Sequence, residues 1–482
     1  MLRRTKILAT LGPATDDPRV LDDVIRAGVD VVRVNLSHDS HERHRQRAET
    51  VRNRAQASGR QVGLLADLQG PKIRIGRFRA GFSELAIDGE FTLDADCPLD
   101  AGDDSRVGIT YRDLVGDVSR GDTLLLDDGA IVLWVNEVEG SRVRCKVVQG
   151  GKLSDSKGIN RQGGGLSAPS LTDKDRRDIV FAAELEADYM AVSFVRSAED
   201  VIEARRLLRE AGGEGGIVAK IERAEALDVI DEIIEASDAI MVARGDLGVE
   251  IGDAELPAVQ KDLIKRARRL NCVVITATQM MQSMIENPIP TRAEVFDVAN
   301  AVLDGTDAVM LSAETSIGRG PAKVVETMAR VCVEAEKQAS ARRSQHRIDS
   351  VFGRVDEAIA MASMYTANHL NVKAIAALTE SGSTVKWMSR ISSGIPIYAL
   401  TRHVATRRKV TLFRGIYPVS FDVASTDVAK VNEEVIDELL RRSAVRDDDL
   451  VIITKGDRSG VEGQTNILKI MRVGEHRLPR DD

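Results

Sequence analysis

The chain has 482 residues, 43% of them hydrophobic and 29% charged, and a formal net charge of −8. This composition is typical of a soluble globular protein, and the length predicts two to four domains. An acidic chain with only 3% aromatic residues is poorly suited to bind nucleic acid, and no apolar run reaches the ~20 residues of a membrane span. Neither a signal peptide nor a CxxC pair is recognisable, so we expect a cytoplasmic protein without disulfides or structural zinc.

Short apolar runs alternate with helical patterns over the first two thirds of the chain, which favours parallel βαβ units. Eight runs are predicted as strands: Thr5–Gly12, Val31–Ser37, Val62–Leu68, Tyr189–Phe194, Gly216–Ile221, Ala239–Gly245, Val273–Met280 and Asp307–Glu314. Each is almost continuously apolar and ends in polar residues, as strands covered on both faces do. Eight such repeats predict a (β/α)₈ barrel, in which the active site lies at the C-terminal ends of the strands.

The stretch from Gly70 to Ser167 interrupts this repeat after the third strand. It contains alternating strand patterns, and its turn pairs Asp128-Gly129 and Glu139-Gly140 are suited to hairpins. We therefore predict a small inserted β domain over residues 70–167, with the barrel formed by residues 1–69 and 168–344.

After the eighth strand, a helix is predicted over Ala322–Lys337 and a polar linker over Ser340–Asp349. Three further apolar runs then alternate with helical patterns, namely Ala374–Leu378, Ile397–Leu400 and Val451–Thr454. This alternation predicts a separate open α/β domain over residues 345–482.

Polar side chains follow several of the predicted strands. Lys220 and Glu222 are two residues apart and so share one face of a strand, as do Arg244 and Asp246. Further candidates at strand ends are Arg33, Asn35, Ser37, Asp67, Thr276 and Thr278. At one mouth of a barrel, two carboxylates would suit a hard cation such as Mg²⁺, and the basic groups would neutralise phosphate and an enolate. The simpler alternative is an ordinary ion pair within each couple.

The chain resembles the pyruvate kinase family in a series of ordered blocks. They are Thr5–Ile7, Gly12–Thr15, Arg33–His38, Asp67–Arg74, Ile217–Glu225, Met241–Glu250, Ala277–Met280 and Thr291–Gly305. The resemblance implies a barrel domain, a β-barrel lid over about residues 70–167 and a C-terminal α/β domain that carries regulation. It also implies transfer of the phosphoryl group of phosphoenolpyruvate to ADP, which yields pyruvate and ATP.

The same resemblance implies a role for each candidate residue. Lys220 and Arg33 would act on the transferring phosphoryl group, with Thr278 near the carbon that is protonated, and Glu222 and Asp246 would hold Mg²⁺, with Mn²⁺ or Co²⁺ as alternatives. The substrate would contact Gly245, Asp246, Thr278, Ser193, Phe194 and Glu314, and the nucleotide would contact Asn35, His38, Arg74 and Lys157.

Lys72 departs from the many family members that need K⁺, because they carry glutamate at this position. An ammonium group can occupy the place of a monovalent cation, so we predict activity without K⁺. The surroundings of this position would be Asn35, Ser37, Asp67 and Leu68. The alternative for Lys72 is a surface residue at the start of the inserted domain.

The segment Thr379–Thr384 follows a predicted strand and precedes a helical pattern. Its hydroxyl groups and glycine suit a phosphate, although a capped helix start without a ligand explains the same pattern. The resemblance implies an allosteric effector there, either AMP or a sugar phosphate, with Thr379, Ser381, Gly382, Ser383 and Thr384 as contacts. It also implies a homotetramer.

Two other functions fit parts of the sequence. One is another Mg²⁺-dependent barrel enzyme that handles an enolate, which the inserted domain and the block around Lys220 disfavour. The other is a non-catalytic metabolite sensor, which the presence of Lys220, Glu222, Asp246 and Thr278 disfavours.

Overall fold

The structure is a computed structural model that describes residues 2–341, 351–423, 428–457 and 463–475. The chain divides into two compact units. The first comprises residues 1–66, 185–189 and 264–482, and the second comprises residues 67–184 and 190–263. Most of the predicted linker, residues 342–349, lies outside the described residues.

Eight parallel strands form a closed barrel in the order β1-β16-β15-β14-β13-β12-β3-β2, which confirms the predicted fold. Their bounds are β1 Lys6–Thr10, β2 Val31–Asn35, β3 Gly63–Asp67, β12 Tyr189–Val192, β13 Gly216–Ile221, β14 Ala239–Ala243, β15 Val273–Ala277 and β16 Ala308–Leu311. Nearly every residue of these strands is buried, because side chains fill the barrel on one face and helices cover the other.

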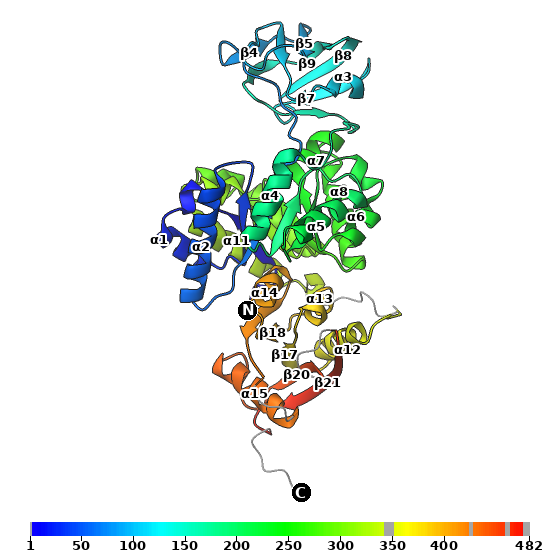
Figure 1. The fold of residues 1–482 in the computed structure, drawn as a ribbon. Helices are drawn as coiled ribbons and strands as arrows, with labels where there is room; N and C mark the ends of the chain where they lie inside the picture. The colour runs from blue at the N-terminus through cyan, green and yellow to red at the C-terminus, as the bar shows by residue number, and fades with distance from the viewer. Residues whose placement is uncertain (1, 342–350, 424–427, 458–462, 476–482) are drawn as a thin grey trace. The chain divides into compact units, whose positions relative to one another are not determined.

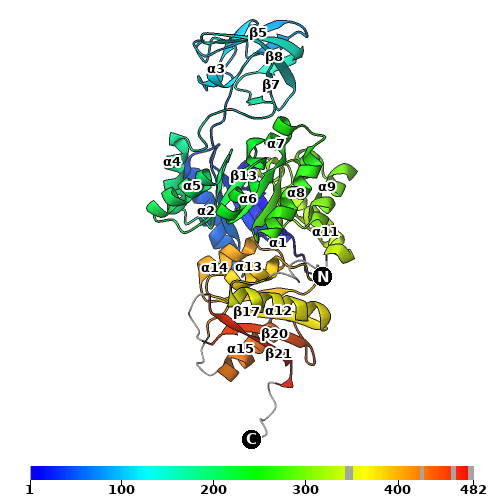
Figure 2. The ribbon, with the colours of Figure 1, turned by 90° about the vertical axis from the view of Figure 1, so that its right-hand side faces the viewer.

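Helices follow the barrel strands and pack on their neighbours, α1 on α2 and α11, and α5 on α4 and α6 (Figures 1 and 2). They are α1 Pro18–Ala27, α2 His41–Ala57, α4 Asp173–Glu184, α5 Ala198–Glu210, α6 Ile230–Ala236, α7 Arg244–Ile251, α8 Leu256–Arg269, α9 Arg292–Asp304, α10 Ala313–Ser316 and α11 Pro321–Ala335. Short 3₁₀ turns are η1 Pro13–Thr15, η2 Glu225–Leu227, η3 Gln282–Ile285, η4 Ala339–Ala341 and η5 Val410–Leu412.

Local sequence sets the ends of these helices. In α9, Thr291 and Glu294 form a capping box, and Gly305 ends the helix with a φ of 100°, a conformation that glycine adopts without strain. In α1, Pro18 occupies the first turn and Asp17 accepts a hydrogen bond from the backbone of Arg19.

Most of the predicted barrel strands end a few residues earlier in the structure, and at β14 and β15 this changes the position of candidate residues. Strand β14 ends at Ala243, and Arg244 and Asp246 lie in the first turn of α7, so their spacing is helical and they do not alternate along a strand. Strand β15 ends at Ala277, and Thr278 follows it with a φ of 66°.

The inserted segment contains antiparallel strands with their own apolar core, shown in cyan in Figure 1. Its elements are β4 Phe82–Leu85, β5 Glu90–Asp94, β6 Arg106–Gly108, α3 Leu114–Asp117, β7 Thr123–Leu126, β8 Ile131–Glu139, β9 Arg142–Gln149, β10 Gly151–Ser154 and β11 Ile159–Arg161. The predicted turns at Asp128-Gly129 and Glu139-Gly140 connect β7 to β8 and β8 to β9, which pair antiparallel, so both hairpins are confirmed.

The C-terminal sheet has the order β19-β18-β17-β20-β21. Its elements are α12 Val355–His369, β17 Val372–Leu378, α13 Ser383–Ser389, β18 Ile397–Thr401, α14 Val404–Lys409, β19 Ile416–Ser420, α15 Val428–Arg441, β20 Leu450–Gly456 and β21 Thr465–Arg472. Apolar side chains of α15 pack against those of β17, β18 and β20. The three predicted strands are present, whereas the edge strands β19 and β21 were not predicted.

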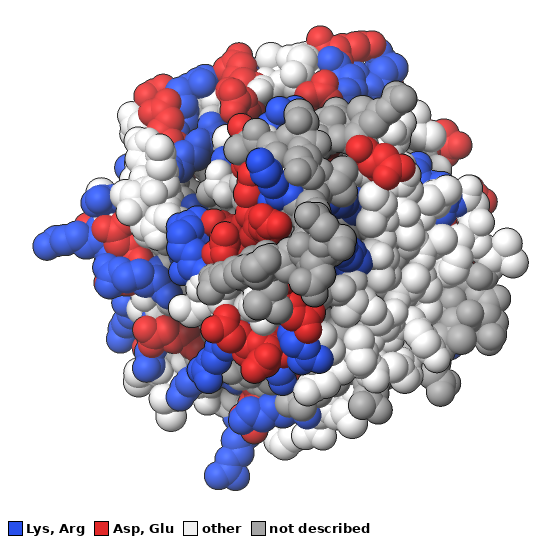
Figure 3. Space-filling view, turned by 90° about the horizontal axis from the view of Figure 1, so that it is seen from below, with Lys and Arg blue, Asp and Glu red and all other residues white. Residues whose placement is uncertain are grey.

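Charged side chains of both signs are interspersed over much of the face seen in Figure 3, and the rest of its described surface is largely uncharged. No helix among the described residues is both long and apolar enough to cross a membrane.

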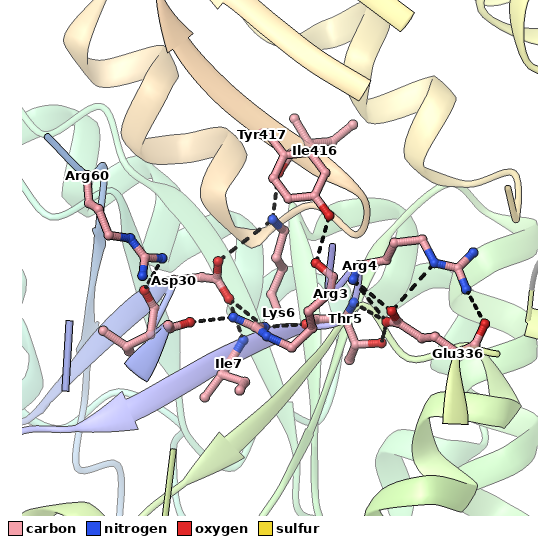
Figure 4. A network of polar contacts seen from close by, with 12 residues as sticks. Arg3, Arg4, Thr5, Lys6, Ile7, Asp30, Arg60, Glu336, Ile416 and Tyr417 are labelled. Atoms are coloured by element: carbon pink, nitrogen blue, oxygen red, sulfur yellow. Dashed lines mark hydrogen bonds and ion pairs between the residues drawn. The ribbon is translucent and has the colours of Figure 1, made fainter. Parts of the chain in front are cut away.

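Lys6 lies in a buried polar network in the first unit (Figure 4). Its Nζ donates to the carbonyl oxygen of Ile416 over 2.6 Å, lies 3.8 Å from an oxygen of Asp30 and sits over the ring of Tyr417. Burial lowers the pKa of Lys6 to about 8 from its ordinary value of 10.5, although the charge of Asp30 opposes the shift.

This pKa predicts a pH dependence of stability. Between pH 8 and 10.5 the unfolded chain keeps a proton that the folded chain has lost, so the free energy of unfolding should rise with pH in this window. Relative to Lys6→Met, the unmodified protein should gain about 1–3 kcal/mol between pH 8 and 10. Urea unfolding of both proteins at several pH values measures this difference, and parallel pH profiles would contradict the prediction.

Candidate active site

Lys220 lies near the end of β13 within a cluster of polar side chains. Its Nζ donates to the hydroxyl oxygen of Ser193 over 2.8 Å and lies 2.8 Å from Glu222 Oε1 and 3.6 Å from Asp67 Oδ1. The predicted ion pair with Glu222 is therefore present, but it belongs to a larger arrangement. An ammonium group held by three partners is fixed in position.

Glu222 follows β13 directly and is 2% exposed. Its Oε2 accepts a hydrogen bond of 2.8 Å from the backbone of Phe194, while Oε1 faces Lys220. The hydroxyl group of Ser193 in turn donates to the carbonyl oxygen of Leu68 over 2.8 Å. These bonds link the ends of β3, β12 and β13, where sequence reasoning had placed the candidates.

Asp246 lies in the first turn of α7, and Gly245 precedes it there. Burial and the negative charge of Glu222 raise the pKa of Asp246 to about 6, and the positive charges of Lys220 and Lys72 act in the opposite direction. The two carboxylates are thus close enough to repel each other. A bound cation would relieve this repulsion.

The oxygen ligands fit a hard divalent cation. Mg²⁺ usually takes one or two protein carboxylates and fills its other positions with water and substrate oxygens. Glu222 and Asp246 provide such a pair. Among the described residues no group of three or more histidine, cysteine, aspartate or glutamate side chains is arranged to hold a metal ion, so a site made of protein ligands alone is not found in that part of the chain.

A pocket of about 220 Å³ in the second unit brings Asp246 together with residues of the inserted segment. Lys72, Arg74 and Lys157 line it. The ammonium group of Lys157 lies 2.7 Å from Asp127, and Arg74 donates to the carbonyl oxygen of Ser156 over 2.8 Å. The pocket therefore holds both basic and acidic side chains, since Asp127 lines it as well as Asp246.

Three residues of this pocket, Glu250, Arg223 and Asp128, were not predicted as site residues from the sequence. Glu250 accepts a 2.8 Å hydrogen bond from the backbone of Ala224, and burial raises its pKa to about 7. Arg223 lies over the ring of Phe194, and Asp128 also lines the pocket. Glu250 lies in the block Met241–Glu250 and Arg223 in the block Ile217–Glu225. Both blocks carry the family resemblance, so the sequence could have indicated these two residues.

The first unit holds the remaining barrel candidates, at the ends of β2, β15 and β16. Arg33 is buried and donates to Thr10 over 3.1 Å. Asn35 accepts a 3.1 Å bond from the backbone of Ser37, and the carbonyl oxygen of His38 lies 2.8 Å from His44 Nε2. These contacts hold the turn after β2.

Thr278 and Glu314 follow β15 and β16. The hydroxyl group of Thr278 donates to the carbonyl oxygen of Ala277 over 2.7 Å. Glu314 is buried and accepts hydrogen bonds from the backbones of Ser312 and Met281. The positive φ of Thr278 is uncommon for a β-branched residue, and such geometry often marks functional positions.

The loop Thr379–Thr384 borders a pocket of about 130 Å³ in the first unit. Gly382 has a φ of 85°, and its backbone donates to the hydroxyl oxygen of Thr379 over 2.9 Å. Ser383 donates to Asp356, and Thr384 is bonded to Thr465. Thr379, Ser381, Ser383 and Thr384 line the pocket together with Arg402 and Lys455.

A (β/α)₈ barrel with a lysine and acidic groups at its strand ends is the arrangement of an enzyme that acts on anionic, oxygen-rich substrates with a divalent cation. The model of the pyruvate kinase barrel domain matches residues 2–325, and that of the pyruvate kinase alpha/beta domain matches residues 357–471. The chain belongs to the pyruvate kinase family.

Full-length relatives agree with this assignment. The chain is 56% identical to pyruvate kinase II of Salmonella typhimurium and 52% identical to the pyruvate kinases of two Buchnera aphidicola subspecies. Each comparison covers 98% of this chain and 99% of the relative. The reaction is therefore transfer of a phosphoryl group between phosphoenolpyruvate and ADP, with pyruvate and ATP as products, in glycolysis.

Proposed function

We propose that this pyruvate kinase works without K⁺, uses Lys220 as its main catalytic cation and responds to a phosphorylated effector in its C-terminal region. The observation that carries the cation proposal is the place of Lys72 in the pocket beside Asp246. Burial and the charge of Glu222 raise the pKa of Asp246, and the positive charge of Lys72 opposes this rise, as a monovalent cation there would. Leu68, Asp67, Asn35 and Ser37 would surround this position.

Lys220 would neutralise the transferring phosphoryl group and the enolate oxygen that develops when the group leaves. A loose transition state spreads negative charge over its oxygens, so fixed positive charge and positioning supply most of the catalysis. Its contacts with Asp67, Ser193 and Glu222 support this role because they hold the ammonium group in place. Arg33 would bind phosphate through its planar fork.

Glu222 and Asp246 would hold Mg²⁺, or Mn²⁺ or Co²⁺ in its place, and the ion would neutralise phosphoryl and carboxylate oxygens of the substrate. The backbone at Gly245 and Asp246 lies in the first turn of α7, where N–H groups are oriented to receive an anion such as the substrate carboxylate. The remaining contacts with phosphoenolpyruvate would come from Ser193, Phe194, Thr278 and Glu314. The contacts with the nucleotide would come from Asn35, His38, Arg74 and Lys157.

The test of the cation proposal is Lys72→Glu. The unmodified enzyme should keep most of its activity when K⁺ is replaced by tetramethylammonium. The variant should lose at least about 100-fold in kcat/KM without K⁺, because uncompensated negative charge then lies beside the substrate anions, and K⁺ should restore much of the loss. Initial rates over a K⁺ series measure both effects.

Lys152→Glu makes the same charge change at an exposed residue of β10 in the inserted segment, and its rates should not depend on K⁺. An unmodified enzyme that is nearly inactive until K⁺ is added would disprove the proposal.

The pocket at Thr379–Thr384 would bind AMP or a sugar phosphate. Its hydroxyl groups, a left-handed glycine and the basic Arg402 and Lys455 support this proposal, because such loops suit phosphate groups. Replacing both Ser383 and Thr384 by alanine should reduce activation by glucose 6-phosphate or AMP to a ratio near 1. Rate curves against phosphoenolpyruvate with and without each metabolite measure this ratio.

Ser389→Ala is the control for the effector variant. Ser389 lies on the same helix, donates to the carbonyl oxygen of Lys386 and is not among the residues that line the pocket. Activation should therefore persist in this variant. Undiminished activation of the double variant would move the effector site elsewhere.

We also propose a cytoplasmic homotetramer with the barrel over residues 1–69 and 168–344, the lid over 70–167 and the regulatory domain over 345–482. Exposed apolar side chains such as Ile289, Phe296 and Ile317 support contacts between subunits.

A further inference from the structure

Four arginine side chains line one small cavity in the first unit. They are Arg4, before β1, Arg268, in the last turn of α8, Arg390, at the end of α13, and Arg414, before β19. The cavity measures about 20 Å³. It admits one compact group and excludes a whole sugar or nucleotide.

Two of the arginines have acidic partners. Arg390 is fully buried and binds both carboxylate oxygens of Asp307, and it also donates to the carbonyl oxygen of Cys272 over 2.7 Å. The guanidinium group of Arg4 lies 3.6 Å from Glu336 and donates to the carbonyl oxygen of Ala341. These two groups are held by the protein itself.

Arg414 is different, because its charge is poorly satisfied. Its side chain is buried and Nη1 makes one long hydrogen bond of 3.4 Å, to the carbonyl oxygen of Thr306. Within the described part of the chain, Nη2 has no hydrogen-bond partner. A buried guanidinium nitrogen without a partner loses its hydration and gains nothing in return.

Arg268 lines the same cavity. Its Nη2 donates to Ser392 over 3.0 Å. Gly305 leaves the room for it, since a Cβ at that position would come within 2.3 Å of Arg268 Nη1. A glycine here thus permits a guanidinium group at the cavity wall.

The pKa values of the cavity arginines also indicate excess positive charge. Burial lowers the pKa of Arg268 to about 10, and the positive charges of Arg414 and Arg390 add to that shift. Burial also lowers the pKa of Arg414 and of Arg4. Among the described residues that line the cavity, four are arginines and one, Asp307, is acidic, so the cavity wall carries excess positive charge.

We propose that this cavity is an anion site that takes a single tetrahedral oxyanion, either inorganic phosphate or the terminal phosphoryl group of a metabolite held at its mouth. Arg414 and Arg268 would be its main ligands, since planar guanidinium groups bind such oxygens through two parallel hydrogen bonds. The site is separate from the pocket at Thr379–Thr384, because the two share no lining residue.

Equilibrium dialysis of the full-length protein with radiolabelled inorganic phosphate tests the proposal. Arg414→Met should bind one phosphate fewer per chain than the unmodified protein, or bind it at least tenfold more weakly, and Arg268→Met should show a similar loss. The Ser383→Ala, Thr384→Ala double variant should keep this phosphate. Thermal unfolding in chloride buffer shows that each variant is folded.

Arg52→Met is the matched control. Arg52 is a half-buried arginine on α2 that donates to the carbonyl oxygen of Leu185, and it is not among the residues that line the cavity. It should bind phosphate normally. Unchanged binding by folded Arg414→Met and Arg268→Met would overturn the proposal.

Competition experiments in the Ser383→Ala, Thr384→Ala background distinguish the source of the anion. Displacement by sulfate but not by glucose 6-phosphate identifies a free oxyanion as the occupant, and displacement by both identifies a phosphorylated metabolite. Displacement by neither would also overturn the proposal.

Discussion

Replacing Lys220 by methionine is expected to lower kcat by at least about 10³-fold. Removing one preorganised group that stabilises transition-state charge typically lowers kcat by about 10²–10³-fold, and an ammonium group should contribute more than a neutral donor. The methionine keeps much of the length of the side chain but leaves Asp67 and Glu222 without the ammonium group that pairs with both. Steady-state rates with phosphoenolpyruvate and ADP at saturating Mg²⁺ measure the loss.

Ser193→Ala is the control for this prediction. It removes the hydroxyl group to which Lys220 donates and retains the ammonium group, so the loss should be about tenfold, the usual effect of one hydrogen bond. A Lys220→Met enzyme within tenfold of the unmodified rate would show that the catalytic charge comes from another residue.

Removing the charge of Asp246 or Glu222 should greatly weaken the response to Mg²⁺. Asp246→Asn and Glu222→Gln each take away one of the two carboxylates, and the Mg²⁺ concentration for half-maximal activity should rise by about 100-fold or more, since even residues behind the ligands change metal affinity by about 10–100-fold. Rates over a Mg²⁺ series and direct titration with Mn²⁺ measure this shift.

The free energy of unfolding, measured without metal, shows whether a weaker Mg²⁺ response of Asp246→Asn comes from lost metal binding or from poor folding. The pKa of Asp246 is raised to about 6 in the folded protein from an ordinary 3.8. The folded protein therefore holds the extra proton between these values, and its stability falls as pH rises through this window. At pH 7 without metal, Asp246→Asn should be more stable than the unmodified protein by about 1–3 kcal/mol.

Asp128→Asn provides the matched control, because Asp128 also acts electrostatically on Asp246 and lines the same pocket. Its Mg²⁺ response should change by less than about threefold. A similar loss in Asp128→Asn and Asp246→Asn would mean that overall charge, and not coordination, controls the metal response.

Many elements of the fold could be predicted because burial leaves a pattern in the chain. All eight barrel strands were recognised as apolar runs, and their parallel closure is confirmed. Strands β19 and β21 were missed for a physical reason: they are sheet edges with mixed exposure, and β19 contains Pro418, which removes a backbone donor and weakens the strand signal.

The site was predictable where neighbours in sequence are neighbours in space. Lys220 and Glu222 share a strand end, and their contact follows from that spacing. The contacts of Lys220 with Asp67 and Ser193 join different strands, so only the placement of β3, β12 and β13 side by side in the barrel brings these groups together. The roles proposed for Arg33, Thr278 and the nucleotide-side residues stay predictions.

The sequence by itself determined the repeating strand and helix pattern, the inserted hairpins and the blocks that carry the family resemblance, because each depends on residues that are close along the chain. Tertiary structure alone decided that Asp246 lies in a helix, that its pKa is raised beside Glu222 and that four arginines share one cavity. Burial and charge interactions depend on distances in space between segments far apart in sequence, and those distances exist only after the chain has folded.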